Sequence, residues 1–331
     1  MKILITGATG FIGRHLVKAL KNEGRSIKCL IRESSQIDFL KELNVEIVYG
    51  DLRDKDSLKK ALIETDIIYN VAGEVFALDA SNYYSVNVSG VNNLLEACSN
   101  GSVRKLIHLS SSSATGPNPV RNVPVNENSP CCPITPYGIS KLEGEKIVKE
   151  LSRSYKVPTV VIRPPLVYGP GVSESSRVLM FLKLIHNGMF RIIGDGNNLV
   201  SLCYIDNLIH GMLLAEKENR SAGETYFLAD ARPYTINEIA STIATELGKE
   251  LPISHMPFFA ANILSFVLPI FSKPFGVTSP LTRNTIKELT SNWFVDIKKA
   301  QLELGYRPIV ELKEGVKKTV EWFVNDYLPI H

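Results

Sequence analysis

Residues 6–13 read Thr-Gly-Ala-Thr-Gly-Phe-Ile-Gly, and they lie between an apolar run, KILIT at 2–6, and a segment of helical period that starts at Arg14. Glycines here permit a tight turn, let the backbone approach a pyrophosphate and let a helix pack closely on a strand. A helix N-terminus adds N–H groups and a positive dipole that bind phosphate. The spacing is G-x-x-G-x-x-G and not the usual G-x-G-x-x-G, but its position after the first strand predicts a dinucleotide site. The residues expected to line it are Gly7, Thr9, Gly10, Phe11, Ile12 and Gly13.

Outward from this loop, short apolar runs alternate with segments of helical period. The runs are KILIT (2–6), SIKCLI (26–31), VEIVYG (45–50), DIIYNVA (66–72), KLIHLS (105–110) and TVVIR (159–163), and the helical candidates are 12–23, 55–64, 84–99 and 137–155. Strands without polar alternation are buried on both faces, as in a parallel sheet covered by helices. The pattern predicts an α/β fold, a Rossmann-type doubly wound parallel sheet.

After about residue 170 the alternation fades. We expect a strand at LVSLCYI (199–205), a strand at ETYFLA (224–229) and an amphipathic helix at 236–248. The predicted division is an NAD(P)-binding domain at 1–170 and a smaller cap at 171–331, mainly substrate-binding, with some segments returning to the sheet.

Composition narrows the class of partner. The 331 residues carry a formal charge of +3 without a long basic run, so a small molecule is expected and nucleic acid is not. The five cysteines are odd in number and lack paired spacing, which favours a reducing cytoplasm over a disulfide framework or zinc site. Cys131 and Cys132 are either loop thiols or a redox-sensitive pair.

Neither a signal peptide nor a membrane span is expected. KILITG already predicts a strand from residue 2, and the apolar segment 258–271 is shorter than the about 20 residues of a spanning helix. This segment is predicted to be a core or lid helix, and the alternative is an apolar surface over a hydrophobic substrate or a peripheral contact with a membrane.

The second strand ends at Arg32, where a ribose-binding acid stands in NAD sites. An arginine there can pair with a 2′-phosphate, so NADP is favoured over NAD, although Glu33 could still reach the ribose. Further cofactor contacts are expected at the carboxyl ends of the next strands, from Asp51, Leu52, Val71, Ala72 and Gly73.

The chemical residues are expected after the fifth strand. Four serines, Ser110 to Ser113, follow it, and Tyr137 and Lys141 lie one helical turn apart downstream. A nearby cation lowers the pKa of a tyrosine from about 10, and a strand-end hydroxyl could then hold a substrate oxygen while tyrosine moves the proton.

With these elements the chain resembles the extended short-chain dehydrogenases/reductases of the NAD-dependent epimerase/dehydratase family. The resemblance covers nearly the whole chain and is carried by TGATGFIG, GDLRD, NVSGVNNLLEAC, LSSSSATG, YGISK, RPPLVYGPG, GDGNNLVSLCYIDNL and AQLELGYRP. It implies a Ser-Tyr-Lys active site of Ser111, Tyr137 and Lys141, with Lys141 also holding the nicotinamide ribose. It further implies that the turn after Arg163, at Pro164, lies near the nicotinamide, and that the chain forms a helix-paired homodimer.

Alternatives remain at several of these residues. Ser112 is the second candidate for the active hydroxyl, while Ser110 and Ser113 are expected to bond local backbone groups. Arg163 either contacts an anionic substrate or supports the fold. The scattered His108, His186, His210 and His255 lack ligand spacing, so no metal is proposed.

Two departures from the family pattern bear on the reaction. No Asp-Glu pair follows Ser111, so dehydration is not expected, and Thr115 stands where many sugar epimerases have tyrosine.

The favoured function is an NAD(P)-dependent oxidoreductase that moves a hydride at a secondary alcohol or ketone, with a nucleotide sugar as substrate of an epimerase or ketoreductase. The alternative enzyme is a 3β-hydroxysteroid dehydrogenase or dihydroflavonol reductase-like protein. A dinucleotide-sensing protein without turnover is the alternative of another class, and the intact Ser111, Tyr137 and Lys141 weigh against it.

Overall fold

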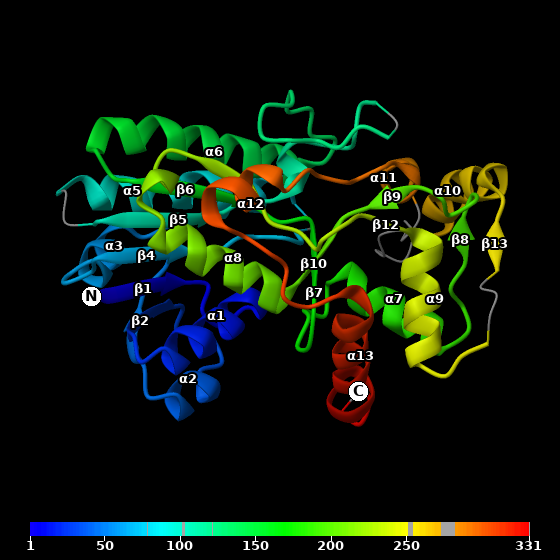
Figure 1. Ribbon diagram of the computed structural model, residues 1–331, viewed down its shortest axis with the longest axis horizontal. Coiled ribbons are helices and arrows are strands. Elements are labelled where there is room, and N and C mark those ends of the chain that lie inside the picture. Colours follow the sequence, from blue (N-terminus) through cyan, green and yellow to red (C-terminus); the bar gives the residue numbers. More distant parts are fainter. Residues whose placement is uncertain (78, 101–102, 121, 251–253, 273–281, 331) are drawn as a thin grey trace.

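A seven-stranded parallel sheet forms the centre of the molecule (Figure 1). The computed structural model describes residues 1–77, 79–100, 103–120, 122–250, 254–272 and 282–330. Neighbouring strands follow the order β11-β6-β5-β4-β1-β2-β3, so the direction of winding reverses between β1 and β4. The strands are β1 Lys2–Thr6, β2 Ser26–Ile31, β3 Glu46–Tyr49, β4 Ile67–Asn70, β5 Lys105–Leu109, β6 Thr159–Arg163 and β11 Thr225–Phe227. The predicted fold class is confirmed, and β11 comes from the second half of the chain.

Helices cover both faces of this sheet. One layer contains α3 Lys55–Ala61, α5 Val91–Ala97 and α6 Pro136–Tyr155, and the opposite layer contains α1 Phe11–Asn22 and α8 Ile205–Lys217, with α2 Asp38–Glu42 beside α1 (Figure 1). Alternate residues of a strand therefore meet different helices. Ile3 and Ile5 pack in the core with Leu16 of α1, whereas Leu4 packs with Leu94 of α5. Burial on both faces explains why these strands carry apolar runs without polar alternation.

The helix predicted over 84–99 begins earlier and is not uniform. It consists of α4 Ala80–Tyr84, a π-helical stretch Ser85–Gly90, α5 and a 3₁₀ turn Cys98–Asn100. Further 3₁₀ turns lie at Ser112–Ala114 and Asn219–Ser221.

Apart from α12, which packs on α8 and β11, the rest of the chain forms small sheets and helices beside the carboxyl ends of the central strands (Figure 1). The strand pairs are β7 Leu166–Tyr168 with β10 Leu202–Tyr204, β9 Leu199–Val200 with β12 Tyr234–Thr235, and β8 Ile192–Ile193 with β13 His255–Met256. The helices are α7 Arg177–His186, α9 Ile236–Glu246, α10 Phe258–Ser272, α11 Arg283–Thr290, α12 Lys298–Leu304 and α13 Leu312–Trp322, which continues as a π-helical stretch Phe323–Tyr327.

The single strand predicted at LVSLCYI is wrong. Its residues divide between β9 and β10, which belong to different sheets, because Ser201 between them donates its N–H to the carbonyl of Trp293 (2.8 Å) and not to either neighbouring strand.

The apolar segment predicted as a core or lid helix is α10, whose side chains are described as far as Phe266. Within that part the core interpretation is wrong, because Phe258, Phe259, Ile263 and Phe266 are exposed. The small residues Ala261 and Ser265 face inward instead. Among the described residues, no helix is both long and apolar enough to cross a membrane.

Candidate active site

The glycine loop joins β1 to α1 at the edge where the central strands end. Gly7 has a φ of +71°, and a Cβ on Gly13 would lie 2.0 Å from the carbonyl oxygen of Gly7, so glycine is required at both positions. Gly10 precedes the first turn of α1 and provides no side-chain cap. The N–H groups of that turn, including those of Phe11 and Ile12, are therefore available to a phosphate.

Arg32 follows β2 as an exposed side chain, with Glu33 exposed beside it. Asp51, after β3, accepts hydrogen bonds from Arg53 at 2.6 and 2.9 Å, and these bonds, with a smaller contribution from the charge of Arg32, lower the pKa of Asp51. Arg53 thus bonds this carboxylate, and Arg32 adds positive charge at the same end of the site. Sequence reasoning missed Arg53, although the quoted motif GDLRD contains it.

The fourth strand end approaches the glycine loop. Ala72 donates its N–H to the Thr6 hydroxyl (3.3 Å), and a Cβ on Gly7 would lie 2.7 Å from the backbone of Ala72. Val71 and Gly73 flank this contact, whereas Leu52, predicted as a further cofactor residue, is buried under Gly90.

Ser111, Tyr137 and Lys141 come together at the ends of β5 and α6. The Ser111 hydroxyl accepts the N–H of Ser113 (3.1 Å). It lies near enough to the Tyr137 side chain to lower the pKa of the phenol. Lys141 donates its Nζ to the carbonyl oxygen of Leu109 (2.6 Å). The Ser111 hydroxyl, the Tyr137 phenol and the Lys141 ammonium group therefore lie beside one short stretch of backbone, residues 109–111.

The ionisation of this group differs from the expectation. Burial raises the pKa of Tyr137 to about 12, and the nearby Ser111 hydroxyl offsets only part of this effect. The pKa of Lys141 is lowered to about 8 because its ammonium group is buried. Lys141 was expected to lower the pKa of Tyr137. Here its Nζ bonds the Leu109 carbonyl oxygen instead, and burial has the largest effect on the pKa of the phenol.

The remaining serines have distinct partners. Ser110 was expected to bond local backbone, and this is wrong, because its hydroxyl donates to the Glu145 carboxylate. Ser112 donates its N–H to the carbonyl oxygen of Pro164 (2.9 Å), which brings the strand end next to the turn predicted to lie near a nicotinamide. Ser113 uses its N–H to reach the Ser111 hydroxyl.

Asn87 is a site residue that sequence reasoning left without a role. It lies in the π-helical stretch Ser85–Gly90, and its side chain bonds both the N–H (2.9 Å) and the carbonyl oxygen (3.0 Å) of Glu74 and the Ser140 hydroxyl (3.0 Å). It thereby ties the loop after β4 to α6, close to Lys141. The motif NVSGVNNLLEAC contained it, but a buried amide is not evident from a motif alone.

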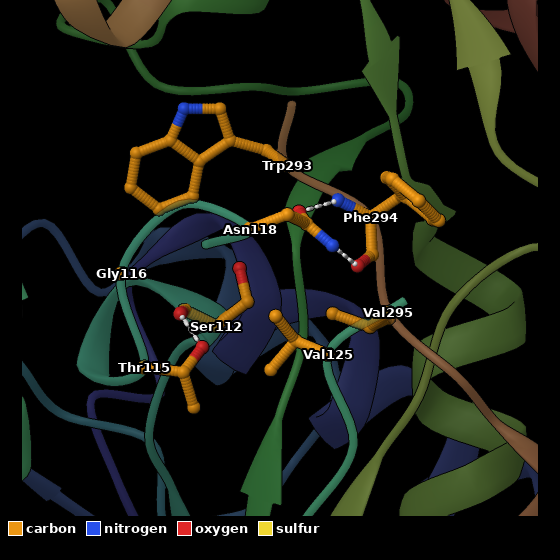
Figure 2. A pocket seen from close by; sticks show the side chains of 8 residues that line it. All are labelled: Ser112, Thr115, Gly116, Asn118, Val125, Trp293, Phe294 and Val295. Carbon is orange, nitrogen blue, oxygen red and sulfur yellow. Dashed lines mark hydrogen bonds between the residues drawn. The ribbon is translucent and has the colours of Figure 1, made fainter. Parts of the chain in front are cut away.

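A narrow pocket, without room for a water molecule in this conformation, lies beside the serines (Figure 2). One wall comes from the loop after β5, and the other comes from a segment almost two hundred residues later. Asn118 joins the two walls through paired hydrogen bonds of 2.8 Å with the N–H and carbonyl oxygen of Phe294. The lining residues are Ser112, Thr115, Gly116, Asn118, Val125, Trp293, Phe294 and Val295. None of the described residues that line this pocket is lysine or arginine. No sequence signal pointed to residues 293–295.

Arg163 supports the fold, as one of the two predicted alternatives has it. It is 2% exposed and forms a bidentate ion pair with Glu145, with an Nε–Oε1 distance of 2.9 Å and an Nη2–Oε2 distance of 2.5 Å.

All five cysteines are free thiols. In the described part of the chain, no three His, Cys, Asp or Glu residues gather as a metal site would require.

Comparisons with known proteins agree with this geometry. The model of the NAD dependent epimerase/dehydratase family matches residues 3–229. The 3beta-hydroxysteroid-dehydrogenase/decarboxylase isoform 2 of Arabidopsis thaliana is 29% identical over 97% of this chain and 61% of its own length. The N-acetyl-alpha-D-glucosaminyl-diphospho-ditrans,octacis-undecaprenol 4-epimerase of Escherichia coli O157:H7 is 28% identical over 97% of this chain and 94% of its own.

Among solved structures, the UDP-glucose 4-epimerase of Thermotoga maritima, crystallised with UDP-glucose, superimposes with a TM-score of 0.79 at 25% identity, covering 98% of this chain and 99% of the other. The family match confirms the predicted class of NAD-dependent oxidoreductase or epimerase. The chain belongs to the NAD dependent epimerase/dehydratase family of enzymes.

Proposed function

We propose that this enzyme transfers a hydride between a nicotinamide cofactor and a secondary alcohol or ketone of an apolar substrate. Tyr137 is the proton donor and acceptor, Ser111 holds the substrate oxygen, and Lys141 holds the nicotinamide ribose. The similarity to the 3beta-hydroxysteroid-dehydrogenase/decarboxylase isoform 2 of Arabidopsis thaliana is the observation that carries the substrate class. The walls of the narrow pocket beside Ser112 are apolar at Val125, Phe294 and Val295, which is compatible with it. Ligand sites of this kind are lined by apolar side chains with a few polar groups that orient the ligand.

The substrate class is where this proposal departs from the nucleotide sugar favoured by the sequence. A nucleotide diphosphate carries at least two negative charges, and buried phosphates are held by arginine, lysine or helix N-termini. The Thr115 hydroxyl and the Asn118 amide beside Ser112 already bond the Ser112 carbonyl oxygen and Phe294, and none of the described residues lining the pocket is a cation. Exposed aromatic residues of α10, such as Phe259 and Phe266, add apolar surface to the same half of the chain.

A nucleotide-sugar epimerase is the second candidate. The similarity to the solved UDP-glucose 4-epimerase over almost the whole of both chains favours it. The two candidates share Ser111, Tyr137 and Lys141 and differ in what binds beyond the reacting carbon.

A ligand panel separates the two candidates. A ligand that binds only the folded protein raises its melting temperature by mass action. We expect 3β-hydroxysteroids added with NAD(P)⁺, or alkyl ketones added with NAD(P)H, to raise the melting temperature and to change the absorbance of the nicotinamide. A response to UDP-sugars alone would reject the apolar substrate and leave the epimerase. Tyr137→Phe is the control, because it should keep the thermal shift and lose turnover.

The preference for NADP is also a proposal. It is supported by the exposed Arg32 after β2, which offers a guanidinium group at the expected position of a 2′-phosphate. Arg53 nearby is already paired with Asp51. We further propose a reducing, cytoplasmic location, in keeping with five free thiols, and a homodimer. Chromatography with light scattering tests the homodimer.

A further inference from the structure

Glu145 is a buried acid to which the proposed function gives no role. It is 1% exposed and lies on α6 one turn after Lys141, which itself lies one turn after Tyr137. Residues four apart share one face of a helix, so all three side chains point to the same side of α6.

The Glu145 carboxylate connects two strand ends. Its Oε1 accepts hydrogen bonds from Nε of Arg163 (2.9 Å) and from the Ser110 hydroxyl, and its Oε2 accepts from Nη2 of Arg163 (2.5 Å). Ser110 directly follows β5 and precedes Ser111, while Arg163 is the last residue of β6 and precedes Pro164. A bidentate, charge-assisted pair of this kind is both strong and geometrically specific.

The backbone repeats the same connection on both sides of Ser111. Ser110 donates its N–H to the Ile162 carbonyl oxygen (2.7 Å), and Ser112 donates its N–H to the Pro164 carbonyl oxygen (2.9 Å). Leu109, in the same segment, accepts the Lys141 ammonium. The side chain of Glu145 therefore braces the stretch of chain that presents Ser111 and anchors Lys141.

Glu145 also acts on the charge of Lys141. The ionisable groups that face the Lys141 ammonium are Glu145 on α6 and His108 on β5. Burial lowers the pKa of Lys141, and the Glu145 carboxylate opposes that effect. Burial and the Lys141 charge hold the pKa of His108 well below its usual range, so its imidazole is neutral at neutral pH. Glu145 thus supplies the negative charge beside Lys141.

We propose that Glu145 is a positioning residue, which holds the Ser111 segment against β6 through Ser110 and Arg163 and places a negative charge beside the ammonium group of Lys141. Any effect on turnover rests on the proposed function. The effect on the protonation of Lys141 does not, because it is a property of the free protein.

The test measures that protonation directly. In protein labelled with [¹⁵N]lysine, the Nζ signal of Lys141, assigned with Lys141→Arg, is followed by NMR against pH. Glu145→Gln removes the charge, and Glu145→Gln with Arg163→Met removes both members of the ion pair, so that no unpaired charge is left buried to unfold the protein. Glu143→Gln is the matched control, because Glu143 lies on the same helix and bonds Lys146 (2.7 Å) without reaching Ser110.

We expect the titration midpoint of Lys141 to fall by about one pH unit in Glu145→Gln, to fall by less in the double variant because the Arg163 charge is lost together with the carboxylate, and to stay unchanged in Glu143→Gln. Ser110→Ala, which keeps every charge, should leave the midpoint unchanged and lower turnover by up to about 10²-fold, the order for a reacting group displaced by about 1 Å. A midpoint within about 0.3 units of wild type in Glu145→Gln would overturn the proposal. A shifted midpoint with unchanged turnover would instead contradict the proposed catalytic role of Lys141.

Discussion

Tyr137 and Lys141 have pKa values shifted in opposite directions. Together these shifts indicate which direction of hydride transfer the protonation states suit at neutral pH. With a pKa raised to about 12, the Tyr137 phenol is protonated at neutral pH, while Lys141, at about 8, is still mostly an ammonium ion. A protonated phenol donates to a carbonyl oxygen, which suits the reduction of a ketone. The reverse reaction needs the phenolate and should gain from alkaline pH until Lys141 loses its charge.

Arg32 gives the first prediction. Arg32→Ala should weaken NADP binding by about tenfold, since one charge-assisted contact with the 2′-phosphate is lost, and should leave NAD binding unchanged. Fluorescence titration of both reduced cofactors measures this difference. Glu33→Ala is the control for charge at the adjacent position and should not weaken NADP binding. Equal NADP affinity in wild type and Arg32→Ala would remove the argument for NADP.

In the turn between β1 and α1, close contact with the backbone limits which residue can stand at a given position. Gly13 faces the Gly7 carbonyl oxygen so closely that any side chain must displace the start of α1. At Gly10 a Cβ would meet the same oxygen at 3.4 Å, which is ordinary contact. The two glycines look alike in the sequence, yet only one is sterically required.

Alanine at these two positions tests that difference. Gly13→Ala should lower the free energy of unfolding by about 1–3 kcal/mol, the range for overpacking, and should weaken cofactor binding because the helix N-terminus moves. Gly10→Ala, with φ of −76°, should be nearly neutral for stability. Urea unfolding and cofactor titration measure both effects. Equal losses in the two variants would contradict this account of the turn.

For the molecule as a whole, Asp230 joins segments that lie far apart in the chain. Its carboxylate accepts the N–H of Tyr204 (2.9 Å), Nδ2 of Asn207 (2.7 Å) and the hydroxyl of Tyr168 (3.1 Å), and Asn207 in turn bonds the N–H of Val310 (2.9 Å). Burial nevertheless raises the pKa of Asp230 to about 6. The contacts between β7, β10, α8 and residues 309–310 thus depend on one acid.

Asp230 makes stability depend on pH with a definite sign. Its pKa is higher in the folded than in the unfolded protein, so the folded state holds the extra proton between about pH 4 and 6. The stability contributed by this group is present below about pH 4 and is lost as pH rises to about 6, amounting to about 2–3 kcal/mol. Asp230→Asn removes this dependence, so its stability relative to wild type should rise across that window in urea unfolding. Asp206→Asn, in the first turn of α8, is the control. Parallel pH profiles for Asp230→Asn and wild type would contradict the prediction.

The sequence predicted those parts of the molecule that depend on local pattern. The six strands from β1 to β6 were evident because burial on both faces requires apolar runs, and the glycine loop was evident because its turn needs glycine. The pocket wall at Trp293 and Phe294 could not be predicted, since long-range bonds such as those to Asn118 and Val125 bring that segment to the site. The role of Glu145 was likewise hidden, because a glutamate on a helix is usually solvated and its ion pair with Arg163 forms only in the folded chain.

Single-turnover kinetics of the serine and tyrosine variants test the central claim, that Ser111 and Tyr137 act on the substrate oxygen. With the substrate selected by the ligand panel and saturating cofactor, absorbance of the reduced nicotinamide measures hydride transfer in wild type, Ser111→Ala, Ser112→Ala and Tyr137→Phe. We expect Ser111→Ala to be about 10²–10⁴-fold slower, Tyr137→Phe at least as slow, and Ser112→Ala close to wild type, with cofactor affinity retained in Ser111→Ala. A near-normal rate in Ser111→Ala together with a large loss in Ser112→Ala would contradict the account, because the reacting oxygen would then be held by the next serine.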